Sequence, residues 1–184
     1  RLTRAGGPES CNSVNMMRLT EALYQDDGDM KYIDYYERVL LNHILANYDP
    51  LEGMCVYYTS MRPASYKIYC SRFDSFWCCT GTGMENFTKC NDSIYFHDEN
   101  TVLVNQFISS NVNWMEKGFV MEQISDIPNS TQTVFIIKEN PNNVKLAIRV
   151  PDWCAGDMKL DINGIVATVQ ADTYLLIEAI AGDV

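Results

Sequence analysis

The sequence predicts an α+β chain in which a helical half, residues 1–93, precedes an antiparallel β-sandwich in residues 94–184. Three observations support this division. Apolar residues of the first half recur every three or four positions, which is the period of an amphipathic helix. Apolar runs of the second half are separated by turn residues at roughly ten-residue spacing, as in β-sandwiches. The length of 184 residues suits one domain or two small ones.

The first half is expected to begin with two long helices. The first follows the side-chain oxygens of Ser10–Asn12, which can cap a helix start, and its apolar stripe consists of Met16, Leu19, Leu23 and Tyr24. The second runs over Met30–Asn47, and its stripe consists of Ile33, Tyr36, Val39, Leu40 and Ile44. Two helices cannot enclose a core by themselves, so their stripes need partners. We therefore expect this chain to be a fragment whose helices complete a larger array.

Residues 51–76 follow the second helix and are rich in aromatic side chains. Met54–Tyr58 and Tyr66–Tyr69 resemble short strands, so we expect a long excursion with hairpin character. The rings could stack on sugar faces, although packing is the commoner role of such clusters. A short helix is then expected over Met84–Cys90, after a tight turn at Thr80–Gly83. A phosphate-binding turn is the rarer interpretation of these glycines, because the lysine of a P-loop is absent.

The second half is expected to contain seven strands, dominated by β-branched and aromatic residues. They are residues 94–96, 101–107, 119–124, 133–137, 144–150, 158–162 and 173–177. Their number and spacing are those of two packed antiparallel sheets.

The charge of the chain restricts its partners. The formal net charge is −10 and no cluster of lysine and arginine is present. Such a chain is a poor ligand for nucleic-acid phosphates and for anionic membranes. No apolar run approaches the roughly 20 residues of a membrane helix. We therefore expect neither nucleic acid nor membrane as a partner, and a neutral or cationic small ligand instead.

The seven cysteines are an odd number without a regular framework of spacings, so reduced thiols are expected. Cys78 and Cys79 are adjacent, and neighbouring residues are poorly placed to bridge each other. Together with Glu9 and Cys11 they supply three thiols and a carboxylate, which is a complete ligand set for zinc. The alternative is that these cysteines are buried core residues, since the Cys-x₂-Cys spacing of many zinc sites is absent.

Glu37, on the second helix beside Tyr35 and Tyr36, is either an exposed partner of Arg38 or a carboxylate of a ligand pocket. Glu85 could support the metal ligands from the short helix. His43 is better explained as a structural residue, and no Ser-His-Asp pattern is visible.

Several motifs together resemble a known enzyme family. They are Glu9-Ser10-Cys11-Asn12, Asn15-Met16, Tyr35-Tyr36-Glu37-Arg38, Asn42-His43-Ile44-Leu45, Phe76-Trp77-Cys78-Cys79-Thr80-Gly81-Thr82-Gly83-Met84-Glu85-Asn86 and Val112-Asn113-Trp114. The chain resembles the β-L-arabinofuranosidase-like glycoside hydrolases of family 127 and the related family 146. The resemblance covers Pro8 to Trp153, and its most specific part is the tryptophan–double-cysteine block.

This resemblance implies the end of an (α/α)₆-barrel catalytic domain followed by a β-sandwich. It implies that Glu9, Cys11, Cys78 and Cys79 bind zinc, and that Cys78 is the nucleophile of a retaining glycosidase. It also implies that Glu37 belongs to the sugar pocket and that the substrate is an arabinose-containing glycan, with release of β-L-arabinofuranose from the non-reducing end.

The chain departs from the family pattern at its start. The general acid/base glutamate of the family lies upstream of the Glu-x-Cys motif, but no carboxylic acid occurs in the eight residues before Glu9. We therefore expect the isolated chain to be inactive and to need the N-terminal helices of its parent. Two alternatives stay open: a carbohydrate-binding module with a structural zinc site, and a degenerate enzyme without catalysis.

Overall fold

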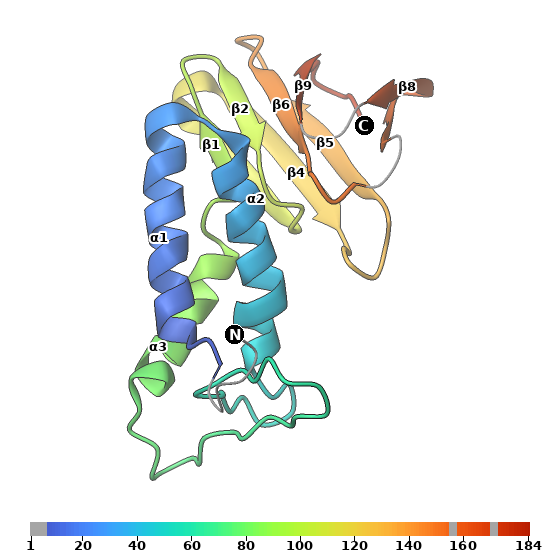
Figure 1. Ribbon diagram of the computed structural model, residues 1–184. Coiled ribbons are helices and arrows are strands. Elements are labelled where there is room, and N and C mark those ends of the chain that lie inside the picture. Colours follow the sequence, from blue (N-terminus) through green and yellow to red (C-terminus); the bar gives the residue numbers. More distant parts are fainter. Residues whose placement is uncertain (1–6, 155–157, 170–172) are drawn as a thin grey trace. The chain divides into compact units, whose positions relative to one another are not determined.

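The computed structural model describes residues 7–154, 158–169 and 173–184, and it confirms the expected combination of helices and sheets (Figure 1). The chain divides into two compact units, Arg1–Asp92 and Ser93–Val184, each with its own internal contacts. The first unit contains the helices and the second contains the strands. No helix in the described ranges is both long and apolar enough to span a bilayer.

Three α-helices form the first unit: α1 (Ser10–Asp27), α2 (Met30–Val39) and α3 (Cys78–Asn86). Helix α1 packs against both α2 and α3. It ends at Gly28, whose φ of 71° is left-handed and whose N–H donates to the Tyr24 carbonyl at 2.8 Å. This is a common way to end a helix, because glycine has no Cβ to oppose that conformation. The side chain of Asp29 then caps α2 by accepting from the Lys31 N–H.

The expected start and stripe of α1 were both partly wrong. The residue that precedes the helix is Glu9, its side chain makes no cap hydrogen bond, and Ser10 is instead a buried helical residue. The buried apolar face contains Val14, Met17 and Tyr24, whereas the expected Met16 and Leu19 are 38% and 50% exposed. Helix α1 carries apolar residues on two faces, so the period alone did not identify the buried one.

The stripe expected for the second helix is confirmed, because Ile33, Tyr36, Leu40 and Ile44 are at most 1% exposed. The helix is not uniform, however. A π-helical turn over Leu40–Ile44 follows α2, and the N–H of Leu45 bonds back to the Leu40 carbonyl. A 3₁₀ turn over Leu45–Asn47 completes the segment.

The glycines after the double cysteine do not form a turn before a helix. Helix α3 begins at Cys78, so Thr80–Gly83 lies inside it, and a 3₁₀ turn over Phe87–Cys90 follows. A Cβ at Gly83 would lie 3.2 Å from Cys55 Sγ and 3.5 Å from the Tyr48 hydroxyl. The glycine therefore permits a close approach, which outweighs its weak helix propensity.

Residues 48–77, here called the strap, connect the second helix to α3 and are the long loop below the helices in Figure 1. The expected hairpin strands are reduced to isolated bridges, which pair Glu9 with Tyr58, Tyr48 with Cys55, and Val56 with Tyr69. Backbone hydrogen bonds from Val56 to Asn47 (3.1 Å) and from Thr59 to Pro8 (3.1 Å) hold the strap against both long helices' ends.

The second unit contains nine strands among the described residues. They are β1 (Tyr95–His97), β2 (Thr101–Val104), β3 (Ser110–Trp114), β4 (Phe119–Ser125), β5 (Thr133–Glu139), β6 (Lys145–Val150), β7 (Met158–Ile162), β8 (Ile165–Val169) and β9 (Thr173–Glu178). β3 and β8 were not expected from the sequence, because β3 alternates polar and apolar residues in only five positions and β8 is mostly exposed.

The strands form a four-stranded sheet (β1-β2-β6-β9), a three-stranded sheet (β3-β4-β5) and a hairpin (β7-β8). All pairs are antiparallel except β2 with β6, which is parallel. The two larger sheets contribute side chains to one buried cluster, including Val104, Phe119, Met121, Leu146 and Ile148. The prediction of β structure is therefore confirmed, although one pair is not antiparallel.

A buried ion cluster ties α1 to the end of α3. Lys89 is 8% exposed at its side chain and contacts Glu21 at 3.1 Å and also Asp92. Burial opposes the charge of Lys89, but its hydrogen bonds to Asp92 and Glu21 outweigh burial and raise its pKa.

We predict that Lys89→Met lowers the free energy of unfolding by about 2 kcal/mol, because two carboxylates would lose their buried partner. Urea denaturation measures this change. The control is Lys31→Met, which removes the exposed Lys31–Asp29 pair and should cost no more than about 0.5 kcal/mol. Equal effects of the two substitutions would contradict a stabilising role for the Lys89 cluster.

Candidate functional site

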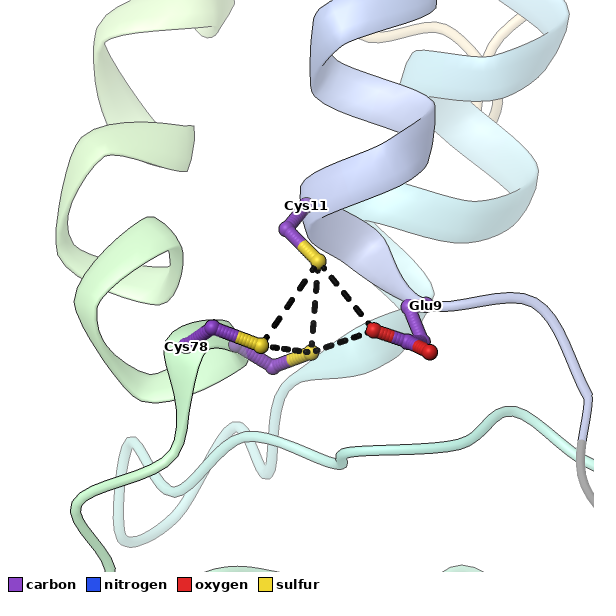
Figure 2. Close-up of side chains that lie close together, drawn as sticks. Glu9, Cys11 and Cys78 are labelled. Atoms are coloured by element: carbon purple, nitrogen blue, oxygen red, sulfur yellow. Dashed lines mark hydrogen bonds between the residues drawn. The ribbon is translucent and has the colours of Figure 1, made fainter.

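The structure brings together the four residues predicted to bind metal. One donor atom from each of Glu9, Cys11, Cys78 and Cys79 lies within 4.8 Å of the other three. Glu9 precedes α1 and Cys11 lies in its first turn, while Cys78 and Cys79 open α3 (Figure 2). The cluster therefore forms where the N-terminal ends of two packed helices meet, from residues 67 positions or more apart in the sequence.

The distances between the donor atoms suit one tetrahedral ion. Cys11 Sγ lies 3.9 Å from Cys78 Sγ and 3.7 Å from Cys79 Sγ, and the vicinal sulfurs are 4.0 Å apart. Two thiolates that share one zinc ion at about 2.3 Å in tetrahedral geometry are about 3.8 Å apart. The Glu9 Oε2 atom lies 3.4 Å from Cys11 Sγ and 4.0 Å from Cys79 Sγ. The residues thus fit a zinc ion in both donor chemistry and spacing, and three sulfurs disfavour magnesium or calcium.

The two adjacent cysteines have different surroundings. Cys79 is fully buried, whereas Cys78 is exposed. Successive residues of a helix point about 100° apart, so a vicinal pair at a helix start can direct one sulfur inward and one outward. A solute could therefore reach Cys78 Sγ but not Cys79 Sγ.

Tyr57 of the strap contacts both sulfurs of the pair. Its hydroxyl lies 3.8 Å from Cys78 Sγ, and its backbone carbonyl accepts from Cys79 Sγ at 3.7 Å. The Tyr57 ring packs against Trp77 and Tyr58, with centroids 5.5 and 4.4 Å away. The sequence placed Tyr57 only within an aromatic cluster, because nothing in the local pattern shows which hydroxyl reaches a cysteine 21 residues later.

The thiols of the cluster differ in acidity. Burial, followed by hydrogen bonds to Cys79 and Glu9, raises the pKa of Cys11 to about 12. Burial also raises the pKa of Cys79. The hydrogen bond with the Tyr57 hydroxyl lowers the pKa of Cys78, while the pKa of Tyr57 rises in response. Cys78 is therefore the thiol of this cluster that ionises most readily, and a bound cation would be needed to ionise Cys11 near neutral pH.

The other candidate residues lie outside this cluster. Glu37 is on α2 and only 4% exposed, so it is not the solvated surface residue that one interpretation expected. Glu85 accepts a 2.9 Å hydrogen bond from Arg18, and both side chains are at least half exposed, so it is a surface ion pair instead of a support for the metal ligands. His43 Nδ1 lies 2.8 Å from Ser13 Oγ, which favours the structural role expected for it.

Comparison with protein families identifies two adjacent matches. Residues 1–92 match the family described as β-L-arabinofuranosidase, GH127 catalytic domain. Residues 101–183 match the GH127 middle domain of the same enzymes.

Individual proteins give the same result. The non-reducing end β-L-arabinofuranosidase of Bifidobacterium longum subsp. longum is 24% identical over 191 residues, which cover 93% of this chain and 29% of that protein. A solved GH127 β-arabinofuranosidase has a TM-score of 0.80 at 20% identity, with 95% of this chain and 31% of that chain covered. Ara127N-Se, a GH127 β-L-arabinofuranosidase from Geobacillus stearothermophilus T6, has a TM-score of 0.76 at 20% identity, with 95% and 30% covered. The chain therefore spans less than a third of the length of these relatives.

We predict that Tyr57→Phe raises the pKa of Cys78, because its largest stabilising hydrogen bond is lost. Alkylation of Cys78 by iodoacetamide in metal-free protein should then become several-fold slower at pH 7.5, and its pH midpoint should move upward. Peptide mass spectrometry can locate the adduct on Cys78 or Cys79. The matched control is Tyr58→Phe, which removes the hydroxyl of the adjacent ring. An unchanged alkylation profile in Tyr57→Phe would contradict the assigned contact.

Proposed function

Since the chain belongs to the GH127 β-L-arabinofuranosidase family, we propose that it is the nucleophile- and metal-bearing part of a zinc-dependent retaining glycosidase. The observation that carries this proposal is the cluster of Glu9, Cys11, Cys78 and Cys79, whose donor spacing suits one zinc ion. A non-reducing-end β-L-arabinofuranoside is the proposed substrate, by similarity to the Bifidobacterium relative.

We propose that residues 1–93 are the last helices of an (α/α)₆-barrel catalytic domain and that residues 94–184 are the β-sandwich that follows it. Two observations support this. The matched GH127 catalytic and middle domains meet between residues 92 and 101. Met16 and Leu19 form an apolar face of α1 that is exposed here, as expected of a helix whose further neighbours belong to a longer chain.

Zinc, when bound by Glu9, Cys11, Cys78 and Cys79, would keep the thiolates ionised and fixed in position. The protein's own residues divide the remaining work. Cys79 and Cys11 hold the buried side of the cluster, where unpaired thiols prefer to stay protonated. Cys78 presents its sulfur to solvent, and the Tyr57 hydroxyl donates to that sulfur in its ionised form.

The proposed reaction uses Cys78 as the nucleophile. Its thiolate attacks the anomeric carbon, the glycosidic oxygen leaves with a proton, and a thioglycosyl bond forms; water then breaks that bond with retention of configuration. This is the two-step retaining scheme with a thiolate in place of the usual carboxylate. Glu37, which is buried on α2, is proposed to contact the sugar.

The proton donor of this reaction has no candidate before Glu9, since residues 1–8 contain no carboxylic acid. In the proposed assignment that donor comes from an upstream helix of the parent. We therefore expect the 184-residue chain alone to release no arabinose, and an arabinose-releasing preparation of it would overturn this expectation.

A second candidate is a carbohydrate-binding module in which the cluster is only a structural zinc site. The full burial of Cys79 favours it, because structural sites are usually closed to solvent. The exposure of Cys78 favours the enzyme instead.

We predict about one zinc ion per chain in protein purified under reducing conditions, because the four donors form one complete ligand set. Elemental analysis should show that the double variant Cys78→Ser, Cys79→Ser loses this zinc. The control variant Cys90→Ser removes a thiol outside the cluster and should keep it. A folded wild-type chain without zinc would contradict the proposed metal site.

In the full-length parent, we predict that Cys78→Ser lowers kcat by at least about a thousandfold, because the covalent step loses its nucleophile. Circular dichroism and the unfolding midpoint should change little, since Cys78 is exposed. If the variant instead loses its fold and the wild-type parent has no turnover, the structural-zinc alternative is correct.

A further inference from the structure

A second pair of thiols lies in the strap, outside the four-donor cluster. Cys55 and Cys70 are 4% and 8% exposed, and their Sγ atoms are 3.8 Å apart. The strap has a bridge between Val56 and Tyr69 in antiparallel register, so Cys55 and Cys70 are the next directly opposed pair. The N–H of Cys70 donates to the Cys55 carbonyl at 2.8 Å, which fixes that pairing.

We propose that Cys55 and Cys70 are a disulfide-forming site that closes the strap covalently. Opposed residues of antiparallel strands have Cα atoms about 4.5–5.5 Å apart, and this range lies inside the roughly 4.4–6.8 Å that disulfides span. The two sulfurs need to approach by roughly 1.8 Å to reach bonding distance. Rotation of the two side chains can supply this approach while the backbone pairing is kept.

The surroundings favour a bridge over a second metal site. The third sulfur near the pair is Met54 Sδ, 3.9 Å from Cys70 Sγ. A thioether is a weak ligand, and the clusters of three or more histidine, cysteine or acidic side chains found among the described residues do not include this pair. The Cys55 N–H instead donates to Cys70 Sγ at 3.3 Å, a contact that a sulfur can keep within a disulfide.

The bridge would separate these thiols from the donor cluster. Cys55 Sγ lies 3.7 Å from the backbone carbonyl of Cys79 and packs against Gly83 of α3. A free thiol at this place can exchange with an oxidised cysteine or compete for a thiophilic metal. Closing the Cys55–Cys70 loop removes that competitor, and it also confines Tyr57, which lies inside the loop and contacts Cys78 and Cys79.

The reaction needs a disulfide as oxidant, for which oxidised glutathione serves. One cysteine thiolate attacks a glutathione sulfur, forms a mixed disulfide and releases one glutathione thiolate. The second cysteine thiolate then attacks the protein sulfur of the mixed disulfide and releases the other glutathione. Two thiols are oxidised, one disulfide is reduced, and the two protons end on the two released glutathione molecules.

Tryptic peptides can identify the bridge, because cleavage after Lys67 separates the two cysteines. Cys55 lies in residues 39–67, Cys70 in residues 68–72, and Cys78 with Cys79 in residues 73–89. The zinc-supplemented 184-residue chain is equilibrated with oxidised glutathione, its remaining thiols are blocked, and it is digested without reduction. We expect peptide 39–67 linked to peptide 68–72 in most molecules. Free or glutathione-capped thiols in both peptides, or a link of either one to peptide 73–89, would overturn the proposal.

Two controls test whether the fold directs this pairing. The same treatment in urea should give mixed pairings among the seven cysteines, and the variant Cys90→Ser should give the native pattern. The thermal midpoint of the wild-type chain should rise by roughly 5 °C on oxidation, because a 15-residue loop is closed, and Cys70→Ser should show no such rise. An equal rise in Cys70→Ser, or the 39–67 to 68–72 link in no greater yield than in urea, would contradict a site built by the fold.

Discussion

The close approach of the first turns of α1 and α3 is the constraint on which the candidate site depends. Glu9 and Cys11 belong to one turn, Cys78 and Cys79 to the other, and neither pair is a complete ligand set alone. The approach is made possible by small or buried residues near both ends: Ser10 has no exposed surface, and Gly83 leaves space for Cys55 and Tyr48. The buried Lys89 cluster holds α3's far end against α1. The site is therefore a property of helix packing, although all of its donors lie in two short motifs.

The strap extends this logic to the outer side of the site. It has no regular strand, yet it pairs with Pro8, with Asn47 and with itself through backbone hydrogen bonds. These few anchors place Tyr57 so that one residue supplies a carbonyl to Cys79 and a hydroxyl to Cys78. A loop with little secondary structure of its own thereby determines which of two adjacent thiols is the more acidic.

The sequence predicted the elements better than their edges and faces. The stripe of the second helix was correct because Ile33, Tyr36, Leu40 and Ile44 are almost its only apolar choice, whereas α1 offers two apolar faces and Met16 was assigned to the wrong one. The glycines after Cys79 indicated a turn, since a close contact with Cys55 that tolerates no side chain cannot be read from local propensity. The four donors were identified from residue types and family resemblance, and their convergence is a tertiary fact. Tyr57 and the opposed Cys55 and Cys70 depend on the register of the strap, which no periodicity encodes.

The π-helical turn at Leu40–Ile44 has a consequence for the way this chain tolerates changes of length. A π turn holds one more residue than an α turn, so deleting one residue there would yield a regular helix and rotate everything after it by about 100°. The first residue to suffer would be Asn47, which is fully buried and holds the strap through its carbonyl and its side chain. A deletion on a helix far from any cysteine would thus disturb the loop that carries Tyr57. Length variation among homologues should therefore avoid this turn and concentrate in the exposed part of the strap, residues 61–68.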